Sequence, residues 1–314
     1  MTQVFQVMKT GLVTSFQDNG RFGYQAYGVV TSGAMDRLSF ELANLLVGNS
    51  PSEACIEMAV VGPTLHVVCE EEVSIAVTGT DLNCCVNGVK APMWKAFRVK
   101  KGDLLSFSGS RDGMYGYIAL RGGFAVTAYL GSKSYYKKAR LGAAIEQGDV
   151  IGGQKPSVCR VRGLVSEEIP AFAKQVTVRV ILGPHDEDFT EESLQQQFLA
   201  QSYNVMQCDR MGTRLQGEAA LCVKDASSDV LSDAIPLGGI QVPQGGQPIV
   251  LLADRQTTGG YRRIGTVIQA DLPKLVQVPV GGTVFFRKVT LEEAYEAMLK
   301  QKAFSNIVNH SSHE

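Results

Sequence analysis

The chain has 314 residues, of which 45% are hydrophobic and 19% are charged, and its formal net charge is -1. This composition is typical of a globular protein of about two domains, and the lack of a basic excess argues against nucleic-acid binding. No apolar run approaches the ~20 residues of a membrane helix, and the N-terminus MTQVFQVMKTGLV lacks the layout of a signal peptide. We therefore expect a cytoplasmic protein with neither nucleic-acid nor membrane partners.

Seven cysteines are spread along the chain without any Cys-x-x-Cys spacing. An odd number of cysteines without this spacing predicts neither a disulfide framework nor a structural zinc site. We expect most of them to be small buried side chains, and we assign the chain no metal.

Short β-type runs dominate the sequence, at residues 73–77, 104–107, 115–120, 176–182, 248–252 and 284–286. Turn signals such as Asn87-Gly88 separate them, and the chain contains six Gly-Gly pairs. Many short strands with tight turns favour β-barrels or sandwiches over alternating strands and helices.

Three helices interrupt this pattern. Residues 36–47 carry an apolar stripe at Leu38, Leu42, Leu45 and Leu46, followed by Gly48 as a C-terminal stop. Residues 190–201 open with Thr190 and two glutamates, and residues 290–303 open with a Thr-Leu-Glu-Glu capping box. We expect the stripe of Leu291, Tyr295, Met298 and Leu299 to face the core, and the NHSSHE tail with His310 and His313 to be frayed.

The charged, proline-containing segment 163–175 is the best candidate for a linker. It predicts an N-terminal β-barrel-like domain over residues 1–165. A C-terminal barrel with a helix and a flexible tail would span residues 166–314.

Several common catalytic motifs are missing from the sequence. It contains no Gly-x-Gly and no GxxxxGK[ST], which excludes the glycine-rich loops that bind nucleotides. It also contains no GxSxG and no HExxH, which excludes the hydrolase motifs with these patterns. Ala297-Met298-Leu299-Lys300 is a distant match to a biotin-attachment site, but it lies in a predicted amphipathic helix, so we expect no covalent biotin on this chain.

Four Asp-Arg pairs lie beside glycines, and this pattern recurs in both halves of the chain. Arginine binds carboxylate or phosphate with two hydrogen bonds, and a neighbouring aspartate can orient it. Each pair could instead be a local turn contact, and the two interpretations stay open for every pair. The pairs are Asp18 with Arg21, Asp36 with Arg37, Asp209 with Arg210, and Asp254 with Arg255.

The most informative stretch is residues 253–275, which follows the apolar run at 248–252. Clustered polar side chains and a glycine pair at the end of a buried strand are suited to presenting hydrogen bonds to a ligand, although a glycine-rich turn with a satisfied backbone is the alternative. We call residues 254–261 the signature segment; they are Asp254, Arg255, Gln256, Thr257, Thr258, Gly259, Gly260 and Tyr261.

DRQTTGGY resembles the signature of the family that contains KipA and the C component of 5-oxoprolinase, also called the allophanate hydrolase subunit 2 or biotin-dependent carboxyltransferase-like family. Further matches run in order along nearly the whole chain. They include residues 17–24, 32–37, 43–49, 121–123, 130–134, 209–212 and 240–243. The chain departs from the family at Gly28-Val29-Val30, where the usual proline, and with it a rigid turn, is missing.

This resemblance implies two cyclophilin-like β-barrel domains and a component of an ATP-dependent 5-oxoprolinase, which opens the lactam of 5-oxoproline to give glutamate. It implies two partners, a KipI-like B component and an A component of the same enzyme, and an ATP site that a partner could share. One alternative is a KipA-type regulatory protein that antagonises a KipI-like histidine kinase inhibitor. Another is a carboxyltransferase-type component related to urea carboxylase.

Under the resemblance, Asp254, Arg255, Thr257 and Thr258 are the candidate catalytic residues. The remaining signature residues and the other three Asp-Arg pairs are candidates for substrate binding, and Lys274 with Asp271 could line the same pocket. His185 lies among carboxylates and could act as a base or metal ligand, but we favour an exposed acidic loop there.

Overall fold

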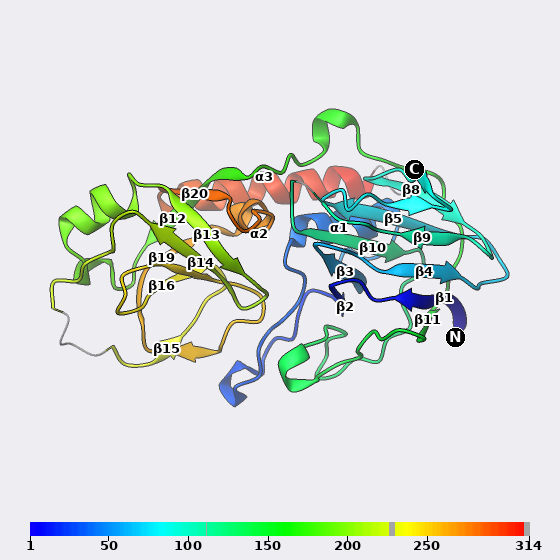
Figure 1. The fold of residues 1–314 in the computed structure, drawn as a ribbon, viewed down its shortest axis with the longest axis horizontal. Coiled ribbons are helices and arrows are strands. Elements are labelled where there is room, and N and C mark those ends of the chain that lie inside the picture. The colour runs from blue at the N-terminus through cyan, green and yellow to red at the C-terminus, as the bar shows by residue number, and fades with distance from the viewer. Residues whose placement is uncertain (111, 226–229, 311–314) are drawn as a thin grey trace. The chain divides into compact units, whose positions relative to one another are not determined.

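The structure is a computed structural model that describes residues 1–110, 112–225 and 230–310. The chain divides into two compact units. Residues 1–21, 32–172 and the chain end from residue 303 form the first unit, and residues 22–31 and 173–302 form the second. Strands predominate in both (Figure 1). No helix within the described ranges has the length and hydropathy needed to cross a membrane.

The first unit contains two sheets. One has the strand order β11-β1-β4-β9-β6-β7, and the other has the order β2-β3-β10-β5-β8. Their strands are β1 (Thr2–Lys9), β2 (Val13–Gln17), β3 (Cys55–Ala59), β4 (Thr64–Val67), β5 (Val73–Gly79), β6 (Cys85–Val86), β7 (Val89–Lys90), β8 (Lys95–Val99), β9 (Leu104–Ser106), β10 (Tyr115–Leu120) and β11 (Val150–Gly153).

Strand β10 is buried along its whole length because both of its faces are covered. Ile118 and Leu120 belong to the apolar core of the unit. On the opposite face, helix α1 (Arg37–Leu46) packs on β5 and β10, and the ring of Tyr117 meets that of Phe40 edge-on at 6.2 Å. Successive side chains of a strand point to opposite faces, which is why one strand serves both contacts.

The second unit is built on a closed barrel with the strand order β12-β19-β16-β17-β14-β13-β20. Strands β12 and β20 run parallel, and the other neighbours are antiparallel. The barrel strands are β12 (Gln175–Leu182), β13 (Tyr203–Cys208), β14 (Gly212–Gly217), β16 (Gly239–Val242), β17 (Ile249–Leu251), β19 (Arg262–Val267) and β20 (Thr283–Lys288). Outside it lie the two-stranded sheet of β15 (Asp233–Ala234) and β18 (Thr258–Gly259), and helix α2 (Leu272–Val276).

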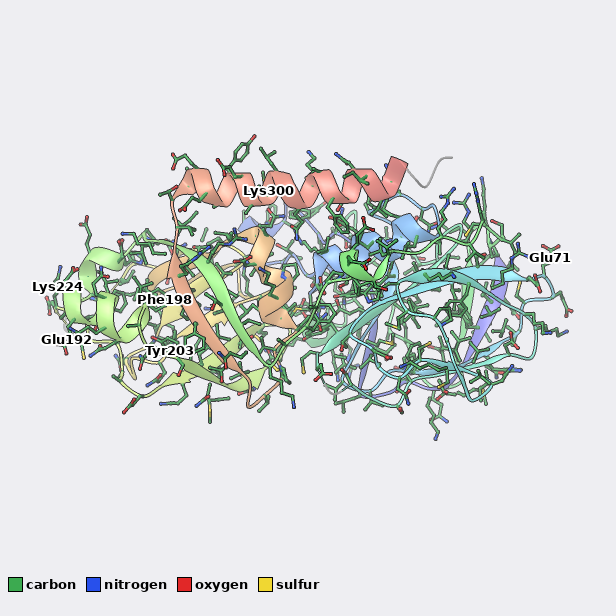
Figure 2. The ribbon with its side chains drawn as sticks, turned by 90° about the horizontal axis from the view of Figure 1, so that it is seen from above. Glu71, Glu192, Phe198, Tyr203, Lys224 and Lys300 are labelled. Atoms are coloured by element: carbon green, nitrogen blue, oxygen red, sulfur yellow. The ribbon has the colours of Figure 1, made fainter. Side chains whose placement is uncertain are left out.

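Aromatic side chains pack together in the second unit. The ring of Phe286 on β20 stacks on Phe198 at 4.8 Å and meets Tyr203 at 5.4 Å. Figure 2 labels Phe198 and Tyr203 beside this strand. Phe198 ends a short helical segment, so this contact ties that segment to β20.

The predicted fold class, mainly β with a few helices, is confirmed, and each predicted strand run coincides with an observed strand. The closed barrel lies in the second unit, whereas the strands of the first unit pair into two sheets. The chain passes between the units at Phe172–Ala173, inside the predicted linker 163–175. Residues 22–31 and the end of the chain belong to the unit opposite to the one that their sequence position suggests.

The helix predicted over residues 190–201 is present, but it covers a shorter range, residues 191–198. Its core is a π-helical segment over Ser193–Phe198. The predicted start is nevertheless capped, since the hydroxyl of Thr190 accepts a hydrogen bond from the amide of Ser193 at 3.1 Å.

Helix α3 (Leu291–His310) is longer than the predicted helix and turns a different face to the protein. Its capping box is confirmed, with the Thr290 amide donating to Glu293 Oε2 at 2.8 Å. The helix continues to His310, so the prediction of a frayed tail is wrong at that residue, and His313 lies outside the described residues. Leu291, Tyr295 and Leu299 are 68%, 57% and 44% exposed, so this stripe does not face the core.

Candidate functional site

Asp254 follows the buried strand β17 and is held by an arginine from the turn between β13 and β14. Its carboxylate accepts hydrogen bonds from Nε and Nη2 of Arg210 at 2.9 and 3.0 Å. The backbones also meet, because the amide of Asp254 donates to the carbonyl of Arg210 at 2.7 Å. Two of the predicted Asp-Arg pairs therefore come together in space, and this aspartate and arginine bind each other with two-point geometry.

The other members of these two pairs bind backbone groups. Asp209 Oδ1 accepts hydrogen bonds from the amides of Met211 and Gly212 at 2.7 and 3.1 Å. Arg255 donates from Nε to the carbonyl of Ile235 at 2.9 Å and from Nη1 to that of Leu252 at 3.3 Å. These contacts fix the shape of the loops, and the catalytic role of Arg255 stays a prediction.

Thr258 and Gly259 of the signature segment form β18, which pairs with β15 in a short sheet that we call the flap. Asp233 pairs with Gly259 and Ala234 with Thr258, and the amide of Ile235 donates to the carbonyl of Thr257 at 3.1 Å. Side chains also hold the flap, since Asp233 forms an ion pair with Arg263 and Arg255 donates to the carbonyl of Ile235. The signature residues exposed to solvent are Gln256, Thr258, Gly260 and Tyr261.

Next to the flap, four residues form a ring in which each one is next to two of the others. Gln241 of β16 is the cross-strand partner of Arg263 on β19. Arg263 forms an ion pair with Asp233, and Asp233 pairs with Gly259 in the flap. A Cβ atom on Gly259 would lie only 2.7 Å from Nε2 of Gln241. We call these four residues the Gln241 cluster.

Three polar atoms of the Gln241 cluster are buried without a hydrogen-bond partner. They are Nε2 of Gln241, Nε of Arg263 and Oδ1 of Asp233. Gln241 is 2% and Arg263 8% exposed. Each such atom costs ~1–3 kcal/mol of folding free energy, so folded proteins keep few of them, and functional sites are where such costs are tolerated. The barrel strands β16 and β19 thus carry two donors without a partner, and the flap carries one such acceptor.

His185 also contacts this cluster through its backbone and its ring. Its Nδ1 accepts a hydrogen bond from the amide of Arg263 at 3.0 Å, and its own amide donates to the carbonyl of Arg263 at 3.1 Å. An accepting Nδ1 places the ring proton on Nε2 while this bond is made. Among the residues that the structure describes, no group of three histidine, cysteine or acidic side chains could hold a metal ion.

Lys274 and Asp271 form an ion pair with each other, and a second cation joins it. Asp271 is 1% exposed and binds Arg179 through two side-chain hydrogen bonds of 2.8 and 2.7 Å, whereas Lys274 Nζ is 3.2 Å from its Oδ1. Burial alone would raise the pKa of Asp271, but the hydrogen bonds from Arg179 outweigh it and lower the pKa below its ordinary value. This arrangement is typical of a structural ion pair.

In the first unit, Asp18 and Arg21 hold one loop in place. Asp18 accepts hydrogen bonds from the hydroxyls of Ser132 and Ser134 at 2.7 and 2.5 Å and from the amide of Lys133 at 2.6 Å. Arg21 is fully buried and donates from Nη2 to the carbonyl of Ser134 at 2.9 Å. Both side chains therefore have a structural role in the loop around residues 129–134.

Asp36 and Arg37 lie at the start of α1. Asp36 is the N-cap, with Oδ1 accepting from the amide of Ser39 at 3.0 Å and Oδ2 from its hydroxyl at 2.6 Å. Burial lowers the pKa of Arg37, with Glu41 acting in the opposite direction. Capping accounts for Asp36, and the predicted ligand-binding role of this pair stays a prediction.

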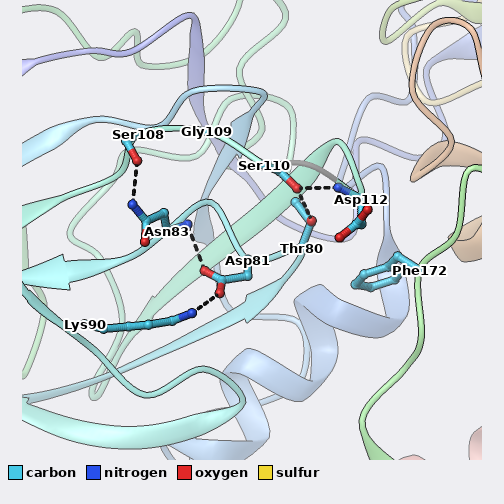
Figure 3. Close-up of a pocket in the computed structure, with 9 residues that line it drawn as sticks. All are labelled: Thr80, Asp81, Asn83, Lys90, Ser108, Gly109, Ser110, Asp112 and Phe172. Carbon is cyan, nitrogen blue, oxygen red and sulfur yellow. Dashed lines mark hydrogen bonds and ion pairs between the residues drawn. The ribbon is translucent and has the colours of Figure 1, made fainter.

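A polar pocket of about 530 Å³ lies in the first unit (Figure 3). Its polar side chains bind one another: Lys90 pairs with Asp81 at 2.8 Å, and Asn83 donates to Ser108 at 2.8 Å. No sequence pattern indicates this pocket, because its residues come from loops that are far apart in the sequence. The lining residues are Thr80, Asp81, Asn83, Lys90, Ser108, Gly109, Ser110, Asp112 and Phe172.

The chain was compared with known protein families and with known proteins. Residues 27–288 match the family described as carboxyltransferase domain, subdomain A and B. The chain belongs to this family. It is 33% identical to the 5-oxoprolinase C component of Haemophilus influenzae over 92% of its own length and 93% of that protein. It is 32% identical to the 5-oxoprolinase C component of Escherichia coli over 96% of both chains.

The solved structure of K. lactis urea amidolyase contains a similar region. It superposes on 98% of this chain with a TM-score of 0.90 and 29% identity. The match spans only 20% of that much longer protein. A region similar to this chain therefore also occurs within a larger enzyme.

The sequence patterns point to the signature segment but not to most of the Gln241 cluster. No sequence pattern points to Asp233 or Arg263, and Gln241 falls only within the family match at residues 240–243. The cluster requires a particular strand pairing, which a single sequence does not reveal. The available signal was a glutamine between the apolar residues Ile240 and Val242, a polar side chain in a run that reads as buried.

Proposed function

We propose that this chain is the C component of an ATP-dependent 5-oxoprolinase complex, which hydrolyses 5-oxo-L-proline to L-glutamate. The observation that carries the proposal is the similarity to two proteins named as this component of 5-oxoprolinase, which covers 92% and 96% of this chain. The family match over residues 27–288 includes the whole signature segment. The partners proposed with it are the KipI-like B component and the A component of the enzyme.

The chemistry explains why such a hydrolase would use ATP. A lactam carbonyl is a poor electrophile, and transfer of the γ-phosphoryl group of ATP to the lactam oxygen would activate the ring carbon. Water then adds to that carbon, the C–N bond breaks, and the nitrogen takes up a proton to become the amine. A second water hydrolyses the resulting acyl phosphate, so that the products are glutamate, ADP and phosphate.

The signature segment offers groups suited to this substrate. In the proposed site, Thr257, Thr258 and the backbone amides of Gly259 and Gly260 donate hydrogen bonds to oxygen atoms as negative charge develops on them. Arg255 lies in the same segment and supplies positive charge near the substrate carboxylate. The ATP site is proposed for the assembled complex, and partner proteins could contribute to it.

Reconstitution from separate proteins tests this proposal. The chain and its B-type and A-type partners are purified separately, and glutamate is measured with ATP and 5-oxoproline while one protein at a time is left out. We expect glutamate only in the full mixture. A tight complex that forms no glutamate from 5-oxoproline would contradict the proposal and favour the KipA-type regulatory alternative.

A carboxyltransferase role is the second candidate, because the family description and the TM-score of 0.90 to urea amidolyase favour it. In that case the chain would accept carboxybiotin from another chain. Avidin, which sequesters biotin, separates the two candidates. It should leave 5-oxoproline hydrolysis unchanged and should abolish turnover that depends on carboxybiotin.

A further inference from the structure

We propose that the Gln241 cluster binds the edge of a cyclic cis-amide, which is the chemistry shared by the lactam of 5-oxoproline and the ureido ring of biotin. This inference deepens the proposed function, because it assigns substrate recognition to residues beside the signature segment. It is carried by the three buried polar atoms of the cluster that lack a partner: Nε2 of Gln241, Nε of Arg263 and Oδ1 of Asp233.

The hydrogen-bonding pattern of the cluster matches a cis-amide. The carboxamide nitrogen and the guanidinium Nε are donors, and an ionised carboxylate oxygen is an acceptor. In a lactam or a cyclic urea, the ring forces C=O and N–H onto the same edge, so that one edge accepts and donates together. An ordinary trans amide points these two groups in opposite directions and cannot satisfy the cluster from one side.

The structure holds the groups of the cluster in place on more than one element. Gln241 and Arg263 lie opposite each other on β16 and β19, strands of the closed barrel. The amide of Arg263 is bound to His185. Asp233 uses Oδ2 for the ion pair with Arg263, which leaves Oδ1 as the spare acceptor. Groups fixed before binding lose little entropy when a ligand arrives.

The flap provides a route to these buried atoms. Gly259 packs directly against Gln241, and a Cβ there would lie 2.7 Å from Nε2 and also 2.7 Å from Cδ1 of Ile235. Opening the flap separates the two residue pairs that join β15 to β18, and it also breaks the Ile235–Thr257 hydrogen bond and the Asp233–Arg263 ion pair. We infer that this local opening exposes the cluster to the ligand. Asp233 belongs to the flap itself, and a ligand N–H bound to Oδ1 would favour its closure.

Ligand competition on the full chain tests the inference. Saturation-transfer NMR is recorded with 5-oxoproline, with 2-imidazolidinone as the ureido probe, and with N-methylacetamide as the trans-amide control. We expect at least one cyclic amide to bind, the two cyclic amides to compete, and N-methylacetamide to displace neither. Stronger binding of 5-oxoproline identifies the lactam as the natural ligand, and stronger binding of 2-imidazolidinone identifies the ureido ring.

The decisive variant is Gln241→Met, which keeps the side-chain volume and removes the donor. We expect cyclic-amide affinity to fall at least tenfold while the melting temperature stays the same or rises, because a buried group without a partner is removed. Gln207→Met on the exposed side of β13 is the matched control and should change neither quantity. Wild-type affinity in Gln241→Met, or equal competition by N-methylacetamide, would overturn the inference.

Failure of this inference and failure of the proposed function give different results. If the complex hydrolyses 5-oxoproline and Gln241→Met leaves its KM unchanged, the cluster proposal is wrong and the proposed function stands. If cyclic amides bind through Gln241 but the complex forms no glutamate, the cluster proposal stands and the proposed function is wrong.

Discussion

Asp271 and Asp254 are buried carboxylates of the second unit, and each is bound by an arginine through two hydrogen bonds. Arg179 serves Asp271, and Arg210 serves Asp254. Breaking such a pair leaves an unpaired buried charge, which costs more than the pair contributes when it is intact. At the scale of single residues, the Arg210 contact holds the start of the signature segment, and the Arg179 contact ties the residue before α2 to β12.

Asp271→Asn should destabilise the protein by about 2 kcal/mol at neutral pH, since a charged hydrogen-bonding partner of Arg179 is lost. The pKa of Asp271 is lowered in the folded state, so its contribution is present above the unfolded value and is lost as pH falls through the folded value. The difference in unfolding free energy between wild type and variant should therefore shrink below about pH 4. Urea unfolding across this range measures it.

Lys274→Gln is the control for that experiment. Lys274 is 53% exposed and its ion pair with Asp271 is screened by solvent, so its loss should cost less than ~1 kcal/mol. A larger loss of stability in Lys274→Gln than in Asp271→Asn would contradict the assignment of Arg179 as the principal partner.

Gly259→Ala should disturb the signature segment, because the new methyl group would lie 2.7 Å from both Gln241 Nε2 and Ile235 Cδ1. Overpacking of this kind costs ~1–3 kcal/mol, and we expect the proposed turnover to fall as well. At Gly245 nothing lies within 4 Å of a Cβ, so Gly245→Ala should be nearly neutral. Thermal unfolding and glutamate formation compare the two variants, and equal effects would show that the packing at Gly259 is unimportant.

At the scale of elements, the amphipathic helix α1 was predicted well because one apolar stripe faces one core. Leu42, Leu45 and Leu46 are buried as expected. Helix α3 also has an apolar stripe, but it uses its alanine face for packing. Ala297 is buried with Ile268 and Val289, while Ala294 packs against the same cluster. Small side chains allow the backbone of a helix to come close to the element it packs on. A pattern of hydrophobic residues alone therefore does not reveal that the alanine face is the packed face.

Because of this orientation of α3, substitutions at Tyr295 and at Ala297 should differ in their effect on the unfolding free energy. Tyr295→Ser removes an exposed ring and should change the unfolding free energy by at most ~0.5 kcal/mol. Ala297→Leu forces extra volume into the contact with Ile268 and should cost ~1–3 kcal/mol. Chemical denaturation of both variants is the measurement, and a larger loss for Tyr295→Ser would mean that the exposed stripe is the packed face.

At the scale of the whole molecule, the sequence predicted a mainly β chain and the signature segment, because strand runs, turns and motifs are local patterns. The Gln241 cluster is not local. Gln241 meets Arg263 only through the register of β16 with β19, which shifts between Ile240 and Gln241, and Asp233 reaches them through the flap. Likewise, Asp254 binds Arg210 across 44 positions of sequence. Closure of the barrel creates these contacts, and periodicity does not encode them.

The central claim is that the assembled complex uses ATP to open the lactam of 5-oxoproline with this chain as an essential component. The most direct measurement follows ADP and glutamate together in the complex as 5-oxoproline is titrated. We predict that both products appear in a 1:1 ratio, that both depend on 5-oxoproline, and that both vanish when this chain is omitted. ADP release that is independent of 5-oxoproline, or glutamate formation without this chain, would contradict the account.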